Sequence, residues 1–224
     1  PTGERPARRS EQAGAWDAKG NRLVMFGGSF AVPQNCSFVA ATSETETWIY
    51  DATCDSWTLS KSATPAGRAR SGSAWKDGMG LLIFGGRSRE GTSGLYTMYN
   101  DLWSFDPDAD KWTKVSNGGG IAKRFNVSMV LREDTGNLLV FGGNTSGSGL
   151  QYTPNNDVWE YNFQSGVWKE LKTAGNVPAK RFFAGALWDS KRDRFVIYGG
   201  ADAGLFSNTA KFKDDIWALD FKQD

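Results

Sequence analysis

Four arginines recur at one position of a repeated sequence pattern, and their side chains are the first candidates for chemistry. They stand 18, 17, 18 and 18 residues before four glycine pairs and are Arg9, Arg68, Arg124 and Arg181. Guanidinium groups arranged around one axis can grip an anionic ligand or an acidic peptide by paired hydrogen bonds. A residue present in every repeat, however, usually serves the packing between repeats. We therefore expect these arginines to be structural.

A second set of candidate residues lies in the long segments that follow the glycine pairs. Loops on a rigid scaffold carry a large share of binding residues, and aromatic side chains with arginines are typical anchors of interfaces. Some of these side chains are expected to tuck under their own loops instead. The candidate binding set is Arg87, Arg89, Tyr96, Tyr99, Tyr152, Phe206 and Phe212.

Histidine is absent from the 224 residues, and this excludes several kinds of catalytic site. Without imidazole there is no Ser-His-Asp triad, no usual zinc site and no ordinary copper site. The acids of Asp106–Asp110 alternate as in calcium loops, but Lys111 and Asn117 stand where that pattern needs glycine and glutamate. A turn explains this segment better. The sequence predicts neither a metal nor a cofactor.

Two cysteines, Cys36 and Cys54, are too few for a disulfide framework or a four-cysteine metal site. One disulfide between them is an open alternative. The repeat pattern places them on opposite faces, about 17 Å apart along a strand, whereas a disulfide needs Cα atoms within about 7 Å. A bond would require the long loop that carries Cys36 to fold back.

Bulk composition excludes two classes of partner. Lysine and arginine number 26 and aspartate and glutamate 25, so the net charge is +1. A dedicated nucleic-acid binder usually has a large basic excess, which argues against nucleic acid as the partner. The longest apolar stretches are short, as in Leu138–Phe141, so we expect no membrane insertion.

The elements that position these residues follow from one repeat. Four apolar runs end in an aromatic residue and two glycines, whose first glycines lie 58, 57 and 57 residues apart: Phe26-Gly27-Gly28, Phe84-Gly85-Gly86, Phe141-Gly142-Gly143 and Tyr198-Gly199-Gly200. All ten tryptophans occupy three positions of this repeat. A fixed period of this size indicates an array of similar supersecondary units.

Each unit reads as four short strands, and no helical periodicity of sufficient length appears. In the second unit the expected strands are Gly72–Trp75, Gly80–Phe84, Trp103–Asp106 and the strand that carries Trp112. Four antiparallel strands per repeat, arranged radially, describe a β-propeller blade. The glycine pairs would allow close backbone approach and positive φ near the axis, and the tryptophans would fill the space between blades.

This pattern resembles the kelch repeat family. The matching features are the hydrophobic run into Gly-Gly, a segment such as Asp101-Leu102-Trp103 with an aromatic residue two positions on, and the second tryptophan. Tyr198 in place of Phe, Leu131 in place of Trp, and Thr45-Glu46 in place of an acid pair depart slightly from it. The resemblance implies an all-β kelch β-propeller over residues 1–224, with repeats at about 6–62, 63–118, 119–175 and 176–224. Most members of the family have six or seven blades.

The resemblance to the kelch family also indicates candidate functions. Members of the family mostly bind proteins or other ligands, so we expect a non-catalytic scaffold that binds a protein partner through one loop face, as part of a larger assembly. A kelch-type enzyme is the first alternative, although the histidines of the copper oxidases and iron-dependent members are absent here. A sugar epimerase using Arg and Glu, and an extracellular glycan-binding module, stay open.

Counting strands adds one expectation. The sequence shows four second strands and four third strands but only three fourth strands with their tryptophan. Exposed sheet edges are features that proteins usually protect. We expect the outer strand of the fourth blade to come from the rest of the native chain or from another chain.

Overall fold

Short antiparallel strands make up the regular structure of this chain. The structure, a computed structural model, describes residues 3–30, 42–89, 95–148, 151–203 and 211–221. These residues form 19 strands and no helix, so the expected all-β class is confirmed. In the same residues no helix is long and apolar enough to cross a membrane.

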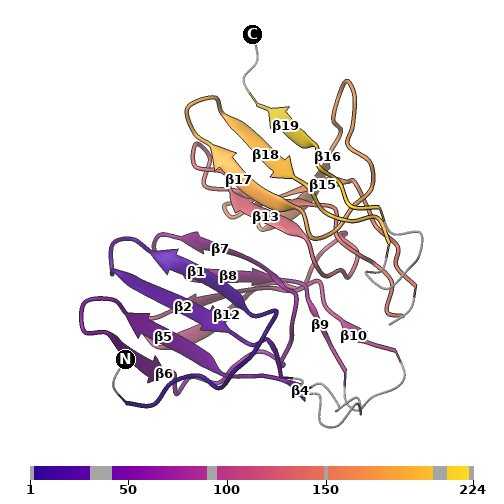
Figure 1. The fold of residues 1–224 in the computed structure, drawn as a ribbon. Helices are drawn as coiled ribbons and strands as arrows, with labels where there is room; N and C mark the ends of the chain where they lie inside the picture. The colour runs from indigo at the N-terminus through magenta and orange to yellow at the C-terminus, as the bar shows by residue number, and fades with distance from the viewer. Residues whose placement is uncertain (1–2, 31–41, 90–94, 149–150, 204–210, 222–224) are drawn as a thin grey trace.

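Most of the strands belong to four antiparallel sheets, one for each repeat (Figure 1). The first sheet has the order β1 (Ala13–Asp17), β2 (Arg22–Phe26), β5 (Thr47–Asp51) and β6 (Ser56–Leu59). The second has the order β7 (Gly72–Lys76), β8 (Gly80–Phe84), β11 (Leu102–Asp106) and β12 (Lys111–Ser116).

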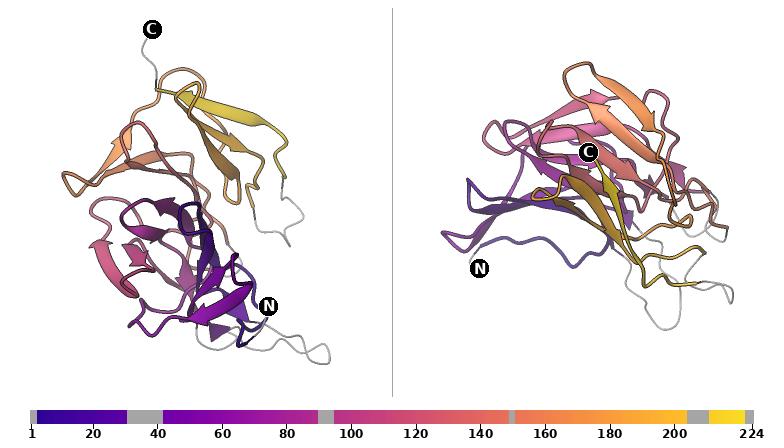
Figure 2. Two further views of the ribbon diagram at one scale, coloured as in Figure 1. Left: turned by 90° about the vertical axis from the view of Figure 1, so that its left-hand side faces the viewer. Right: turned by 90° about the horizontal axis from the view of Figure 1, so that it is seen from above.

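The third and fourth sheets repeat this order. The third comprises β13 (Ser128–Leu131), β14 (Leu138–Phe141), β15 (Val158–Asn162) and β16 (Val167–Leu171). In the described part of the chain the fourth has three strands, β17 (Gly185–Asp189), β18 (Arg194–Tyr198) and β19 (Ile216–Asp220). Figure 2 shows the sheets fanning out, with β19, in yellow, at the outside of the last one.

The four sheets are arranged as the blades of a β-propeller. Their first strands lie next to one another in the order β1, β7, β13 and β17, and this row forms the inner edge of the array. Each second strand carries the most apolar run of its blade, and β8 is buried along its whole length. A strand buried on both faces reads as a continuous hydrophobic run, which explains Leu81–Phe84.

Two small strand pairs extend from the loops between the second and third strands. They are β3 (Ser29–Phe30) with β4 (Thr42–Ser43), and β9 (Arg87–Ser88) with β10 (Thr97–Met98). Both pairs project from the same edge of the molecule (Figure 1). We call this edge the loop face.

The glycine pairs have the close approach expected of them. Gly85 has a φ of +65°, and a Cβ atom there would lie 2.4 Å from the carbonyl oxygen of Arg124 in the next blade. The N–H of Gly86 donates to that same oxygen over 2.9 Å. Only a residue without a side chain permits this contact, because a Cβ cannot approach a carbonyl so closely.

Tryptophans of the outer strands fill the space between successive blades, as expected. Trp112 in β12 is 6% exposed and packs its ring 4.9 Å from that of Phe26 in the preceding blade. Its Nε1–H donates to the Thr47 hydroxyl over 2.9 Å. Trp168 in β16 lies likewise 4.9 Å from Phe84.

Between the third and fourth blades the equivalent position is a pocket. Its lining includes Phe141, Val158, Phe195, Ile197 and Leu219, which occupy the same repeat positions as five residues of the cluster around Trp168. The pocket lies beside β19, whose far side pairs with no strand in the described part of the chain.

Replacing Trp112 by alanine is expected to lower the free energy of unfolding by about 3–5 kcal/mol, because it removes a buried ring and leaves a cavity between two blades. Urea unfolding followed by circular dichroism measures this loss. The matched control is Trp57→Ala in β6, whose half-buried ring contacts Trp48 and Tyr50 of its own blade. Its loss should be about 1–2 kcal/mol. Equal losses would show that the tryptophan does not join blades.

A peptide with the sequence of residues 165–173 should bind beside β19 and place its tryptophan in the pocket near Phe141. Extended peptides can add to an open sheet edge. The equivalent space between the second and third blades already holds the indole ring of Trp168. Amide chemical-shift changes confined to β19 and the pocket would report this. The same peptide with alanine for tryptophan should bind at least about tenfold more weakly, and equal binding by the two peptides would contradict the match.

Candidate functional site

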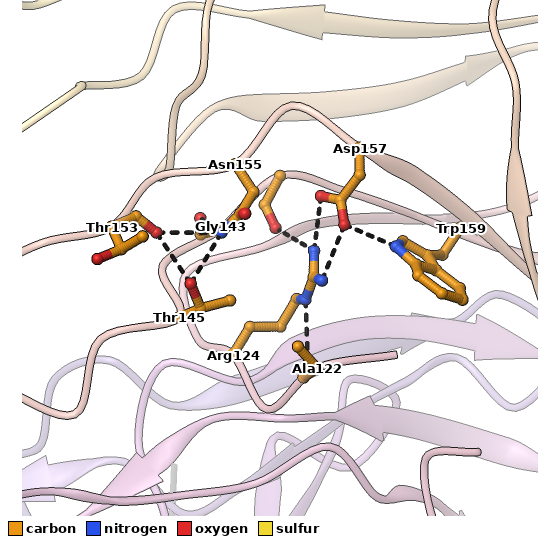
Figure 3. A network of polar contacts seen from close by, with 9 residues as sticks. Ala122, Arg124, Gly143, Thr145, Thr153, Asn155, Asp157 and Trp159 are labelled. Atoms are coloured by element: carbon orange, nitrogen blue, oxygen red, sulfur yellow. Dashed lines mark hydrogen bonds and ion pairs between the residues drawn. The ribbon is translucent and has the colours of Figure 1, made fainter. Parts of the chain in front are cut away.

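Each repeated arginine is held in a network within its own blade. In the third blade the Arg124 guanidinium donates to both Asp157 carboxylate oxygens over 2.8 and 2.9 Å and to the Gly142 carbonyl over 3.0 Å (Figure 3). Its Nε donates to the Ala122 carbonyl, and the Trp159 Nε1 donates to the same carboxylate over 2.6 Å. All these donors have acceptors, which leaves this arginine little capacity for a ligand.

The other blades repeat the same network. Arg9, Arg68 and Arg181 pair with Glu46, Asp101 and Asp215, which also accept hydrogen bonds from Trp48, Trp103 and Trp217. The backbones of these arginines also join blades: the carbonyl oxygens of Arg68, Arg124 and Arg181 accept from Gly28, Gly86 and Gly143 of the preceding blade. The arginine thus ties two glycine pairs together, one through its side chain and one through its main chain.

The paired acids are stabilised in their charged form. Burial by itself raises the pKa of Asp101, but the hydrogen bond and charge of Arg68 outweigh burial and hold that pKa below its ordinary value. Arg181 lowers the pKa of Asp215 in the same way, against a smaller effect of burial. A carboxyl whose pKa falls on folding stabilises the fold above its ordinary pKa of about 4, and this contribution is lost as the pH falls through the folded value.

The Asp101→Asn variant should therefore lose most stability near neutral pH. The difference in free energy of unfolding from the wild type should be large at pH 7. It should shrink as the pH falls below about 4, where the unfolded chain takes up the proton first, and vanish below the lowered pKa of folded Asp101. Urea unfolding at pH 7, 4 and 3 measures it. Glu133→Gln, at an exposed position, is the control and should show little difference at any pH. A difference for Asp101→Asn that stays constant with pH would contradict the ion-pair explanation.

Two residues beyond each arginine, four non-glycine residues adopt left-handed backbone conformations. They are Glu11, Arg70, Asn126 and Phe183, with φ of 62°, 63°, 55° and 59° in turn. The amides of Arg70, Asn126 and Phe183 each donate to the carbonyl of the preceding member over 2.9, 2.9 and 3.1 Å. We call this chain of hydrogen bonds the axial arc. It joins the four blades where the inner strands begin.

Three arginines gather beside the first half of the axial arc. The pocket on the loop face there is lined by Ser10, Glu11, Ser29, Ser43, Ala69, Arg70, Arg87, Ser88, Arg89 and Tyr96. Arg87 is brought next to the arc because its backbone exchanges two 2.9 Å hydrogen bonds with Ala69. We call this the arginine pocket.

Aromatic rings hold the arginines in place. The Arg87 guanidinium carbon lies 3.8 Å from the centre of the Tyr96 ring and 4.4 Å from that of Phe125, and the Arg89 guanidinium carbon lies 4.4 Å from Tyr96. Guanidinium groups stack favourably on aromatic faces, and the gain is larger where water is excluded. Arg70 faces the Phe183 ring at 5.3 Å.

Polar partners for these arginines are few. Arg70 forms an ion pair of 2.5 Å with Glu11. The Arg87 side chain is buried, with 6% of the residue exposed. Its Nε and Nη1 atoms have no hydrogen-bond partner among the described residues. The Nε atoms of Arg70 and Arg89 and the Nη1 of Arg70 are also unpartnered. Burial, together with the positive charge of Arg70, lowers the pKa of Arg87.

The structure brings together only part of the candidate binding set. Arg87, Arg89 and Tyr96 meet in the arginine pocket. Tyr152 lies nearby, stacked at 5.1 Å on Phe182 and edge-on at 6.4 Å to Phe125.

The other candidates are not among the residues that line the arginine pocket. Tyr99 contacts the Ser88 hydroxyl and lies under the Arg68 guanidinium. Phe212 is 69% exposed beside a second opening at Tyr198, on the fourth blade. Phe206 lies outside the described residues.

The structure describes only one of the two cysteines. Cys54 is an exposed free thiol in the turn between β5 and β6, and Cys36 lies outside the described residues. A disulfide between the two stays the open alternative that the sequence offers.

Sequence reasoning missed Glu11, Arg70, Phe125 and Phe183. The signal was present in the repeat, because Glu11, Arg70, Asn126 and Phe183 all stand two residues after the recurring arginine. The residue type at this position differs in every repeat, which indicates that the side chain does not serve the packing between repeats. The four residues nevertheless share a left-handed backbone, so all four lie where the inner strands begin.

Four antiparallel sheets joined along their inner strands define the class of β-propellers. A family model described as the KLHDC2/KLHL20/DRC7 Kelch-repeats domain matches residues 96–224, which is more than half of the chain. The chain therefore belongs to the kelch-repeat family. Among solved structures, that of YjhT superposes with a TM-score of 0.70 over 94% of this chain and 68% of that chain at 17% identity, and this likeness concerns the fold alone.

Three curated relatives are similar over about two thirds of the chain or more. A leucine-zipper-like transcriptional regulator 1 homolog of Drosophila melanogaster is 33% identical over 65% of this chain. The flagellar outer-arm dynein alpha chain of Chlamydomonas reinhardtii is 28% identical over 64%, and Adagio-like protein 3 of Oryza sativa is 31% identical over 73%. The matches cover 13%, 3% and 24% of these relatives, respectively.

Proposed function

We propose that this chain is a non-catalytic scaffold that binds a protein partner through the loop face of its propeller, with the arginine pocket at the centre of contact. The observation that carries this proposal is the arrangement of Arg87 and Arg89 around Tyr96 in a concave site built from loops. Arginine and tyrosine are, with tryptophan, enriched among the anchors of protein interfaces.

The way the pocket is supported favours binding. Tyr96 and Phe125 fix the Arg87 side chain between them, so that little side-chain entropy remains to be lost when a partner docks. Strand β9 presents Arg87 from a backbone that is paired with β10. Tyr96 directly precedes β10, and its amide donates to the Gly147 carbonyl over 2.8 Å. Preorganised anchors of this kind raise affinity because the cost of ordering them has been met in folding.

The relatives agree with a role in assemblies. The dynein alpha chain is by its name a component of the flagellar outer arm, and the chain described here matches only 3% of it. The matching segment is there one part of a much larger polypeptide. By analogy, residues 1–224 would serve to attach a partner rather than to transform a small molecule.

Selection from a phage-displayed random peptide library tests this function. Peptides enriched on the wild-type chain should bind the Arg89→Ala and Tyr96→Ala variants at least about tenfold more weakly, because each variant removes an anchor. Arg192→Ala is the matched control: this arginine is exposed in the turn between β17 and β18, on the opposite face, and pairs only with Asp189 among the described residues. It should leave binding unchanged.

Two results would contradict the proposal. Selected peptides could lose binding with Arg192→Ala and keep it with Arg89→Ala, which would place the contact on the opposite face. Turnover of a sugar by the purified chain, abolished by Arg89→Ala, would instead identify an enzyme of the epimerase type.

A further inference from the structure

Several guanidinium N–H groups of the arginine pocket are buried without a hydrogen-bond acceptor, which costs free energy of folding. A buried donor without an acceptor loses its bond to water and gains nothing in return, at about 1–3 kcal/mol and more for a charged group. Among the described residues, five such nitrogen atoms belong to Arg70, Arg87 and Arg89. Unsatisfied buried groups of native proteins call for an explanation, and an unfilled ligand site is one.

The charge balance points to the kind of ligand. Three guanidinium groups share the pocket with one carboxylate, that of Glu11. Glu11 pairs with Arg70, whereas Arg87 and Arg89 form no ion pair with any described residue. Every unpartnered side-chain atom here is a donor, and the four lining residues Ser10, Ser29, Ser43 and Ser88 add hydroxyls around them. A group that accepts hydrogen bonds and carries negative charge fits both needs.

We propose that the arginine pocket binds the carboxylate of an acidic side chain in the protein partner, between Arg87 and Arg89, beside the Glu11–Arg70 pair. This rests on the proposed function and names the chemistry by which the partner is recognised. Glu11 shows within the chain itself that a carboxylate is accepted here, since it lies 2.5 Å from Arg70. An incoming carboxylate would complete the same kind of pairing for the arginines that lack one.

Glu11 also sets the strength of the site. Its carboxylate pairs with one terminal nitrogen of Arg70 and opposes a second negative charge through like-charge repulsion. The side chain is held there because Glu11 is a member of the axial arc, whose backbone is fixed by the amide of Arg70. Removing the charge of Glu11 should therefore tighten binding of an acidic ligand, an effect that a purely structural role would not produce.

Nuclear magnetic resonance of the arginine Nε–Hε groups provides a direct readout. The probes are the peptide acetyl-Gly-Glu-Gly-amide, its glutamine counterpart and inorganic phosphate. The glutamate peptide should shift the Arg87 and Arg89 signals in a saturable way, and the glutamine peptide should bind at least about tenfold more weakly. Arg192, on the opposite face, gives the control signal and should not move.

Variants separate recognition from folding. Arg87→Met keeps the apolar stem between Tyr96 and Phe125 and should reduce affinity for the glutamate peptide at least about tenfold. Glu11→Gln should raise that affinity about threefold or more. If Arg87→Met fails to fold, Glu11→Gln and the peptide pair still decide, because neither needs that variant.

Three outcomes would overturn the carboxylate site. They are equal binding of the glutamate and glutamine peptides, shifts with phosphate alone, and a loss of affinity in Glu11→Gln. Library peptides that bind through Tyr96 and Arg89 but contain no acidic residue would likewise overturn it while leaving the scaffold function intact. Failure of the library selection itself would instead count against the scaffold.

Discussion

The recurring arginine is the contact on which the array depends. In the second and third blades its guanidinium ties the acid before the third strand to the first glycine of its own pair, and its carbonyl accepts from the second glycine of the blade before. Arg68 and Arg124 are each 2% exposed, so these bonds are made away from water, where they are strongest. One residue type thus makes bonds both within a blade and between successive blades.

Much of this architecture could be predicted from the sequence because the same pattern of residues occurs four times in it. The Gly-Gly pairs, the aromatic runs and the tryptophans predicted four-stranded blades, and the structure has them in that order. Repetition helps because a signal too weak in one copy, such as a strand of five residues, becomes clear in four. The position of Trp112 against Phe26 follows from the same logic.

The candidate site was only partly predictable, and the reason is physical. Arg87, Arg89 and Tyr96 were found because they stand in a long loop with interface composition. Arg70 and Glu11 were not, because nothing in their residue types reveals a left-handed backbone that directs them to the axis. Left-handed conformations cost a non-glycine residue about 1 kcal/mol and depend on surrounding bonds, which no local pattern shows.

The axial arc separates the part of the chain that must stay constant from the part that can change. Its four members share a left-handed backbone, while their side chains are an acid, a base, an amide and an aromatic ring. A fold that duplicates its units can therefore diversify at these four places without disturbing its scaffold. Exchange of one side chain at one of these positions would change the chemistry beside the axis and leave the backbone hydrogen bonds of the arc in place.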